Sequence, residues 1–331
     1  MLRFLPLLLW VGCAYRLGPP KVSYGTPVQL DLVQPSTDHS RWYVPIEVNG
    51  EPQLLFVDTG YSFTTCDDGL IASLDLDVRG SKKLKGEVGT TVAEKAVLPP
   101  FQLGDHTVEG LVCMVRDLGA TSSIRDPKEI AVAGVLGVDL LRRFRTEIAP
   151  DQALIRLSDP GEHEPIKDGE STVAIPREGF IGTRVSMPLQ IGEHTVWPIV
   201  DTGAANTYVD GEHLGLTPSF VQQDVTIRGS GGTGSTVTDR AYYERADLKL
   251  GTEGLPTLTL TQRNRTVTTD GLLGLDILNR FRVELDFETN RARLTPTTPA
   301  PIPRWSSYSG SPQLVMAYSS SSSDSNKSTV R

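Results

Sequence analysis

The sequence is poor in cysteine, histidine and basic clusters, and each shortage excludes a class of protein. Its 331 residues include 3 Cys and 5 His. The histidines show no short metal-ligand spacing, so we expect neither a metal nor another cofactor. Lys and Arg number 32 against 40 Asp and Glu, which gives a net charge of −8. No Lys/Arg block is longer than two residues, so no nucleic acid partner is expected, because phosphate binding needs a concentrated basic surface.

Three familiar catalytic motifs are also missing. The chain has no Gly-x-Ser-x-Gly nucleophile turn, no Walker phosphate loop and no His-Glu-x-x-His helix. What it does contain is many Gly, Pro, Thr and Val residues between short apolar runs, a texture typical of β structure. The length is sufficient for two domains of about 100 to 200 residues, each with its own core.

The first 13 residues are typical of an export signal. Arg3 is followed by the apolar stretch from Phe4 to Gly12, which is too short to span a bilayer as a helix. The stretch ends at Cys13 and resembles a bacterial lipoprotein signal, in which this cysteine is lipidated; an ordinary cleaved signal and a misassigned start are the alternatives. We therefore expect export to the periplasm or the extracellular face, with a membrane tether if Cys13 is lipidated. Residues 14–21 are too short for a typical blocking prosegment, so we expect no zymogen.

The other two cysteines, Cys66 and Cys113, both lie in the first half of the chain. In an oxidising compartment they can pair as a disulfide. Two buried apolar thiols are an equal alternative, because the sequence gives no distance between them.

An internal duplication organises the chain. Residues 48–60 align without gaps on residues 191–203, and each segment reads as an apolar strand, a turn, a second apolar strand and then Asp-Thr-Gly. Residues 134–145 match residues 271–282, with eight of twelve positions identical. The second Gly of this Leu-Gly motif follows the aspartate by 79 residues in the first copy (137 − 58) and by 73 in the second (274 − 201). The Asp-Thr-Gly and Leu-Gly motifs recur in the same order and at nearly the same spacing, which indicates two homologous lobes.

Each copy carries a glycine-punctuated segment between its two motifs. Glycines at such points suit a hairpin tip that bends over a ligand, an interpretation we favour over a surface hairpin without a ligand. Behind each Leu-Gly motif, apolar residues at helical spacing predict a short helix. The candidate flap residues are Gly86, Val88 and Gly89 in the first copy and Gly229, Gly231, Gly232 and Gly234 in the second.

These features predict five segments along the chain. They are a signal (1–13), a first lobe (22–157), a polar linker containing Gly and Pro (158–171), a second lobe (172–296) and a tail (297–331). The tail is rich in Pro, Thr and Ser. We expect it to be disordered, because such a composition buries too little apolar surface to form a core.

The paired Asp-Thr-Gly motifs at Asp58 and Asp201 make the sequence resemble the retropepsin-like and pepsin-like aspartic protease superfamily, in particular its bacterial two-lobed type. The resemblance covers residues 40–295 and implies an all-β fold of two homologous β-barrel lobes, with an active-site cleft between them. It implies that the two aspartates are the catalytic pair. It also implies supporting roles in the active-site loops for Thr59, Gly60, Thr202, Gly203, Gly137 and Gly274.

The chemistry that two carboxyls allow can be stated independently. Hydrolysis of an amide by water needs a base for the water and an acid for the carbonyl oxygen, and two carboxyls that share one proton supply both. Neighbouring carboxylates cannot both ionise cheaply, so one keeps its proton. We therefore predict a monomeric aspartic endopeptidase acting on peptide or protein substrates, without assigning which aspartate is the base.

Tyr61 departs from the family pattern, in which a small residue follows Asp-Thr-Gly; Ala204 fits that pattern in the second copy. A ring beside Asp58 motivates an alternative function, a catalytically inactive peptide- or protein-binding module with the same two-lobed fold. A dimer of half-size lobes, as in retroviral enzymes, is superfluous because the second Asp-Thr-Gly is intact.

Overall fold

Strands dominate the structure, a computed structural model that describes residues 18–35, 41–86, 89–118, 132–169, 172–174, 184–228, 235–262 and 270–317. Within these residues the helices are short, so the all-β prediction is confirmed. No helix in this part of the chain is long and apolar enough to cross a membrane. The signal segment with Cys13 lies outside the described residues, as do the flap candidates Val88, Gly229, Gly231, Gly232 and Gly234.

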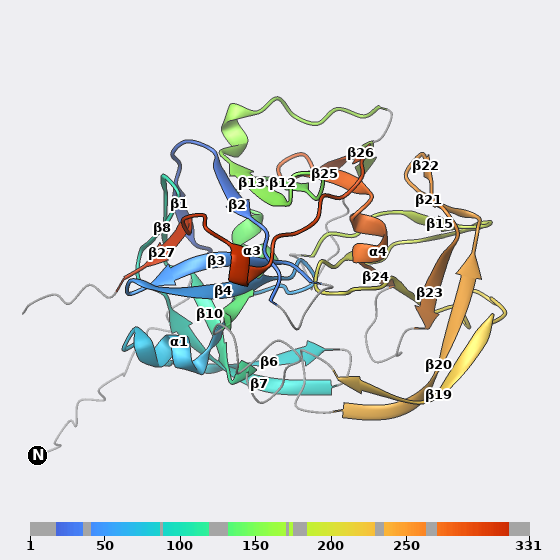
Figure 1. The fold of residues 1–331 in the computed structure, drawn as a ribbon, viewed down its shortest axis with the longest axis horizontal. Coiled ribbons are helices and arrows are strands. Elements are labelled where there is room, and N and C mark those ends of the chain that lie inside the picture. Colours follow the sequence, from blue (N-terminus) through green and yellow to red (C-terminus); the bar gives the residue numbers. More distant parts are fainter. Residues whose placement is uncertain are drawn as a thin grey trace, which may run out of the picture.

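The first repeat and one later strand, residues 314–316, form one mixed sheet of 11 strands, on the left of Figure 1. Within this sheet a tight turn at Asn49 and Gly50 joins residues 43–48 to residues 51–57 as a hairpin. Both turn residues have the positive φ (51° and 83°) that the common two-residue hairpin turn requires. The spatial order is β1 (Lys21–Ser23), β9 (His106–Glu109), β8 (Phe101–Leu103), β27 (Leu314–Met316), β3 (Tyr43–Val48), β4 (Glu51–Val57), β11 (Val132–Leu136), β5 (Thr65–Asp67), β10 (Val112–Arg116), β7 (Gly89–Val97) and β6 (Ser81–Gly86).

The second repeat divides its strands between two sheets, on the right of Figure 1. The larger has six strands, in the order β17 (Ile199–Val200), β24 (Gly271–Leu273), β18 (Tyr208–Val209), β23 (Leu258–Gln262), β20 (Ser235–Arg245) and β19 (Phe220–Arg228). The smaller has four, in the order β16 (His194–Val196), β15 (Leu189–Ile191), β21 (Leu248–Leu250) and β22 (Glu253–Gly254).

A further six-stranded sheet contains strands of both repeats, at the top of Figure 1. At its centre β12 of the first repeat pairs with β25 of the second, with Ile148 opposite Val283. Beneath it the apolar side chains of the two repeats form one continuous core. The order is β14 (Thr172–Ala174), β26 (Arg291–Pro296), β25 (Phe281–Asp286), β12 (Arg145–Ala149), β13 (Leu154–Ser158) and β2 (Val28–Asp31).

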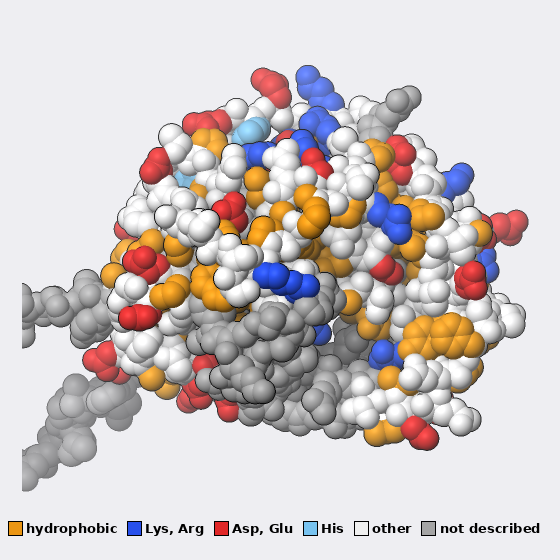
Figure 2. All heavy atoms as spheres, in the orientation of Figure 1, with side chains coloured by type: hydrophobic (Ala, Val, Ile, Leu, Met, Phe, Trp, Pro, Cys, Tyr) orange, Lys and Arg blue, Asp and Glu red, His pale blue; other side chains and the backbone are white. Residues whose placement is uncertain are grey.

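Charged side chains reinforce this shared sheet. The Arg145 guanidinium, which is 5% exposed, contacts Asp286 at 2.5 Å and Glu284 at 2.9 Å across the β12–β25 pair. Arg282 of the second repeat contacts Glu147 and Asp151 of the first. On the face drawn in Figure 2, the described Lys and Arg side chains are interspersed with Asp and Glu.

The same local topology presents the aspartate of each repeat. In the first repeat β11 runs parallel to β4, pairing Leu136 with Val57, and antiparallel to β5. In the second, β24 runs parallel to β17, pairing Leu273 with Val200, and antiparallel to β18. A short helix follows each Leu-Gly motif as predicted, α3 (Val138–Leu141) and α4 (Leu275–Leu278); the other described α-helix is α1 (Asp68–Ser73).

The prediction that residues 297–331 form a disordered tail is wrong for the part described, which reaches residue 317. Strand β27 inserts into the first-repeat sheet, parallel to β3 and antiparallel to β8. Leu314 is 1% exposed and Met316 is 3% exposed, so this short apolar run completes the core of the first lobe. The prediction failed because the segment is rich in Ser and Pro and its apolar run, residues 314–316, is short. Three residues are enough to form a strand here, because β3 and β8 both present an unpaired strand edge.

Candidate active site

Each candidate aspartate stands at the end of a buried strand. The backbone N–H of Asp58 donates to the carbonyl of Leu136 (3.2 Å), and that of Asp201 donates to Leu273 (3.0 Å). The carboxylate of each accepts a hydrogen bond at 2.8 Å from the N–H of the glycine two residues on, Gly60 or Gly203. The two carboxyl groups are therefore oriented by equivalent loops.

The glycines place the two carboxyl groups face to face. A Cβ atom on Gly60 would lie 2.6 Å from Cγ of Asp201, and one on Gly203 would lie 2.5 Å from Cγ of Asp58. Contacts below 3 Å are not tolerated, so any side chain at either position would push the opposite carboxyl away. Asp58 is 4% exposed and Asp201 is 9% exposed, which leaves the pair almost enclosed.

Thr59 and Thr202 join the two loops through four reciprocal hydrogen bonds. The Thr59 hydroxyl donates to the carbonyl of Val200 (2.7 Å) and accepts from the N–H of Thr202 (3.1 Å). The Thr202 hydroxyl donates to the carbonyl of Val57 (2.9 Å) and accepts from the N–H of Thr59 (3.1 Å). All the groups involved are buried, so the four bonds fix one loop against the other.

Burial and mutual repulsion keep a proton on this pair. Burial raises the pKa of Asp58, although hydrogen bonds from backbone N–H groups and the charge of Arg41 act in the opposite direction. Burial also raises the pKa of Asp201 well above its ordinary value, and the negative charge of Asp58 raises it further. Two carboxyls so placed titrate as one unit that holds one proton over a range of pH.

The Leu-Gly motifs press against the loops that carry the aspartates. A Cβ atom on Gly137 would lie 2.6 Å from the backbone of Phe63, and one on Gly274 would lie 2.3 Å from the backbone oxygen of Asn206. Both glycines therefore allow a strand to pass directly beneath an aspartate loop.

Each repeat contains a buried threonine–aspartate pair that was not predicted from the sequence. Thr64 donates to Asp139 from its N–H and its hydroxyl, both at 2.8 Å, and its hydroxyl oxygen accepts from the Gly137 N–H (3.3 Å). Thr207 and Asp276 repeat the arrangement at 3.0 and 2.7 Å, with the Gly274 N–H donating to Thr207 at 3.0 Å. The spacing of these residues in the sequence could have revealed the pairs. Each threonine follows the candidate catalytic aspartate of its repeat by six residues, and each paired aspartate follows the glycine of the Leu-Gly motif by two.

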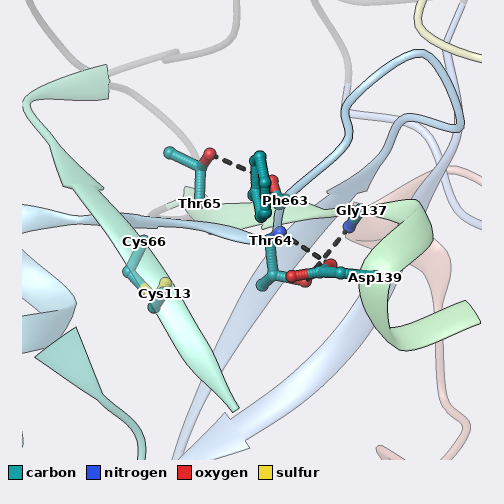
Figure 3. The surroundings of a disulfide bond; sticks show 7 residues. All are labelled: Phe63, Thr64, Thr65, Cys66, Cys113, Gly137 and Asp139. Carbon is teal, nitrogen blue, oxygen red and sulfur yellow. Dashed lines mark hydrogen bonds between the residues drawn. A yellow bond between two sulfur atoms is a disulfide. The ribbon is translucent and has the colours of Figure 1, made fainter. Parts of the chain in front are cut away.

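A disulfide joins Cys66 and Cys113, with their Cα atoms 5.8 Å apart. Of the two alternatives left open by the sequence, the structure therefore has the paired form. Figure 3 shows the bond beside the Thr64–Asp139 pair. Cys66 lies on β5, directly after the Asp58 loop, and Cys113 lies on the neighbouring β10. The bond thus fastens the strand that leads away from the candidate site.

The glycine-punctuated segments are hairpins in both repeats. Strands β6 and β7 pair up to Gly86 opposite Gly89, and β19 and β20 pair up to Arg228 opposite Ser235. The two hairpins extend toward each other in the view of Figure 1. The first also contacts its own aspartate loop, because the Lys82 ammonium lies 3.6 Å from the centre of the Phe63 ring.

Tyr61 packs against the small apolar cluster that includes Val33, Tyr43 and Phe56. Its ring therefore contributes to the apolar packing of the first lobe. The next residue, Ser62, accepts a hydrogen bond from Nε of Arg184 (3.0 Å), a residue of the second repeat that sequence analysis did not single out.

Comparison with known proteins supports the superfamily predicted from the motifs. Residues 44–140 match the aspartyl protease family, which supports the retropepsin-like aspartic protease superfamily. No curated protein gives a sequence match.

Three solved structures similar to this chain share little sequence with it. One is edgp, with 10% identity, a TM-score of 0.49 and coverage of 84% of this chain and 98% of that one. Another is conglutin gamma, a unique basic 7S globulin from lupine seeds, with 11% identity, a TM-score of 0.46 and coverage of 82% and 96%. The third is a retropepsin-like aspartic protease from Rickettsia conorii, with 17% identity, a TM-score of 0.29 and coverage of 38% and 98%.

Proposed function

We propose that this protein is an aspartic endopeptidase in which Asp58 and Asp201 activate one water molecule against a peptide bond. The observation that carries the proposal is the position of each carboxyl against the glycine of the opposite loop, with almost no exposure to solvent. Paired carboxyls of raised pKa supply the base and the acid that amide hydrolysis requires.

The reaction follows from the one proton that the pair holds. The ionised carboxyl takes a proton from water as the water oxygen bonds to the scissile carbonyl carbon, and the protonated carboxyl gives its proton to the carbonyl oxygen. The resulting tetrahedral diol then collapses: the carbon–nitrogen bond breaks, the protonated carboxyl gives its proton to the leaving nitrogen, and one diol hydroxyl gives its proton to the ionised carboxyl as the carbonyl re-forms. A carboxylic acid and an amine are released. The pair ends with the single proton with which it began.

Tyr61 packs against an apolar cluster of the first lobe and directly follows the Asp58-Thr59-Gly60 motif. A silent peptide-binding module is therefore the second candidate function. We further propose that the protein is exported and acts as a monomer, tethered by a lipid if Cys13 is modified. The Cys66–Cys113 disulfide supports the export part, because such bonds persist in oxidising compartments.

The test is cleavage of an unbiased peptide mixture by the purified full chain from pH 3 to 8. Replacement of either aspartate, in Asp58→Asn or Asp201→Asn, is expected to reduce cleavage on the order of 10²- to 10⁴-fold, because each removes one proton-transfer group. The matched control is Asp77→Asn, whose carboxylate is 81% exposed and which should retain full activity. A folded wild-type chain that binds peptides without cleaving them at any pH would establish the silent module instead.

A further inference from the structure

The two glycine-punctuated hairpins leave their sheets at corresponding points. In the first hairpin, β7 pairs with β10 from Val97 to Glu94, and beyond Glu94 its partner among the described strands is β6 alone. In the second hairpin, β20 pairs with β23 from Arg245 to Tyr242, and beyond Tyr242 its described partner is β19 alone. Each hairpin therefore projects from the end of its sheet, in the lower part of Figure 1.

A cation lies directly beyond each of these points. Lys82 is opposite Ala93, the first residue of β7 beyond Glu94, and Arg240 is two residues beyond Tyr242. Residues that lie opposite each other in an antiparallel pair share one face of the sheet. Because Ala93 is 1% exposed, Lys82 lies on the face of the first hairpin that is turned toward the protein.

Each cation lies over an aromatic ring of its own repeat. The Lys82 ammonium is 3.6 Å from the centre of the Phe63 ring, and Cζ of Arg240 is 5.6 Å from the centre of the Tyr208 ring. Both distances are within the range of about 6 Å over which the face of a ring attracts a cation. The two contacts therefore join the base of each hairpin to another segment of the same repeat.

Both rings are held close to the candidate aspartates. Phe63 follows Asp58 by five residues (63 − 58), and its backbone is the one against which Gly137 packs. Tyr208 follows Asp201 by seven residues (208 − 201) and lies on β18, which pairs with β24, the strand beside that aspartate. A contact with either ring therefore couples a hairpin to the segment that follows a candidate aspartate.

The two contacts use positions that are not equivalent in the repeats. The position that corresponds to Phe63 in the second repeat is Asn206 (201 + 5), and the one that corresponds to Tyr208 in the first repeat is Thr65 (58 + 7). Neither of these side chains has an aromatic ring. Inheritance from one ancestral repeat therefore does not account for the two contacts, whereas a shared requirement at the base of each hairpin does.

The rings are the partners that the structure gives to these two cations. Among the described residues, neither Lys82 nor Arg240 forms an ion pair with a carboxylate. Nε of Arg240 is buried and has no hydrogen-bond partner in this part of the chain. Lys82 is half-buried, and a cation that has lost part of its water gains more from a ring than an exposed one does.

We propose that Lys82 and Arg240 are positioning residues, each of which holds the base of one hairpin against the segment that follows the aspartate of its repeat. This inference rests on the proposed peptidase function and names the residues that keep the hairpins in the position in which they bind a peptide. Apparent affinity falls with the fraction of the protein in the binding-competent state, so a hairpin that leaves this position weakens peptide binding. Neither residue takes part in proton transfer.

The experiment is a double-mutant cycle on the full chain, measured with a hydroxyethylene peptide that cannot be cleaved. Calorimetry gives dissociation constants for the wild type, Lys82→Met, Phe63→Leu and the double variant. Lys82→Arg keeps the cation, and Lys83→Met, which removes an exposed lysine of the same strand, is the matched control. Arg240→Met and Tyr208→Leu form a second cycle. Amide hydrogen exchange of β6 and β20 in the free protein gives a measurement that needs no ligand.

Lys82→Met is expected to raise the Kd and the KM on the order of 3- to 10-fold, through the loss of one cation–ring contact. Hydrogen exchange of β6 should accelerate by a similar factor. The kcat should stay within about twofold of the wild type, because the proton-transfer groups are unchanged. Lys82→Arg and Lys83→Met should both bind the peptide within about twofold of the wild type. Phe63→Leu should add little to Lys82→Met in the double variant, since either change removes the same contact.

Two results would overturn the positioning role: affinity and hydrogen exchange of Lys82→Met equal to those of Lys83→Met, or fully additive effects of Lys82→Met and Phe63→Leu. The same criteria apply to Arg240 and Tyr208. Failure of the proposed function gives a different pattern. Peptide binding that depends on both contacts, without cleavage of natural peptides, would leave the positioning role in place and remove the peptidase activity. If no peptide binds, hydrogen exchange of the free protein still decides whether the contacts hold the hairpins.

Discussion

The hydroxyl of Thr59 and the hydroxyl of Thr202 each bond to the backbone of the other's loop, so that four buried hydrogen bonds link two equivalent loops. Each bond connects one repeat to the other. The relative position of the two aspartates is therefore set by side chains that never need to touch a substrate.

Replacement of Thr59 by valine should loosen this connection while preserving the shape of the side chain. The change leaves the Thr202 N–H and the Val200 carbonyl buried without their partner, at a cost of about 1 to 3 kcal/mol for each group. We expect a lower free energy of unfolding in urea and a lower kcat. Thr59→Ser, which keeps the hydroxyl, should behave like the wild type, and Thr107→Val on β9 is the control for a threonine outside the site. Equal stability of Thr59→Val and the wild type would contradict the structural role.

Removal of the Arg184 charge should move the pH profile of cleavage. Because the cation lowers the pKa of Asp201, Arg184→Gln is expected to raise the pKa values of the coupled pair. Activity requires one proton on the pair, so both limbs of the kcat profile should move to higher pH. Arg79→Gln should leave both limbs in place. A movement to lower pH would show that the charge of Arg184 does not act on the pair.

Asp139 should make the stability of the first lobe depend on pH. Burial raises the pKa of Asp139 to about 6 from an ordinary value of 3.8. A raised pKa in the folded state means that the contribution to stability is complete below pH 3.8 and is lost as pH rises through 6. The loss is on the order of 2 to 3 kcal/mol.

The variant Asp139→Asn keeps an oxygen for the Thr64 N–H but cannot ionise. Relative to the wild type, its free energy of unfolding in urea should therefore improve between pH 4 and pH 7. Asp276→Asn should show the same trend, since burial also raises the pKa of Asp276. A difference between variant and wild type that is constant over this range would exclude ionisation of Asp139 as the cause.

The inserted strand β27 should contribute measurably to the stability of the first lobe. Leu314→Ala removes a fully buried side chain and is expected to lower the free energy of unfolding by about 2 to 5 kcal/mol. Val315, its half-exposed neighbour on the same strand, is the matched control, and Val315→Ala should cost much less. Truncation after residue 312 should destabilise the protein at least as much as Leu314→Ala.

The parts of the fold that could be predicted are those repeated in the sequence. Two Asp-Thr-Gly motifs and two Leu-Gly motifs fixed the order of the elements, and helices α3 and α4 follow where apolar spacing indicated. The same physical constraint acts in both copies. Gly137 and Gly274 each lie so close to the backbone of an aspartate loop that no side chain fits at either position. A single copy of either motif would have carried far less weight.

The features that could not be predicted depend on distances between residues far apart in the chain. The pairing of Cys66 with Cys113 requires β5 and β10 to be neighbours, which no local pattern reveals. The insertion of Leu314 between β3 and β8 depends on two strand edges formed hundreds of residues earlier.

The position of β27 also constrains the order in which the protein can reach its native state. Residues 314–316 pair with β3, which begins at Tyr43, so the sheet of the first lobe contains a strand that the ribosome makes only after the whole second repeat. The first lobe therefore cannot be finished while the second is still being synthesised, and its two open strand edges stay without a partner until then. The lobe that comes first in the sequence is the last to be completed.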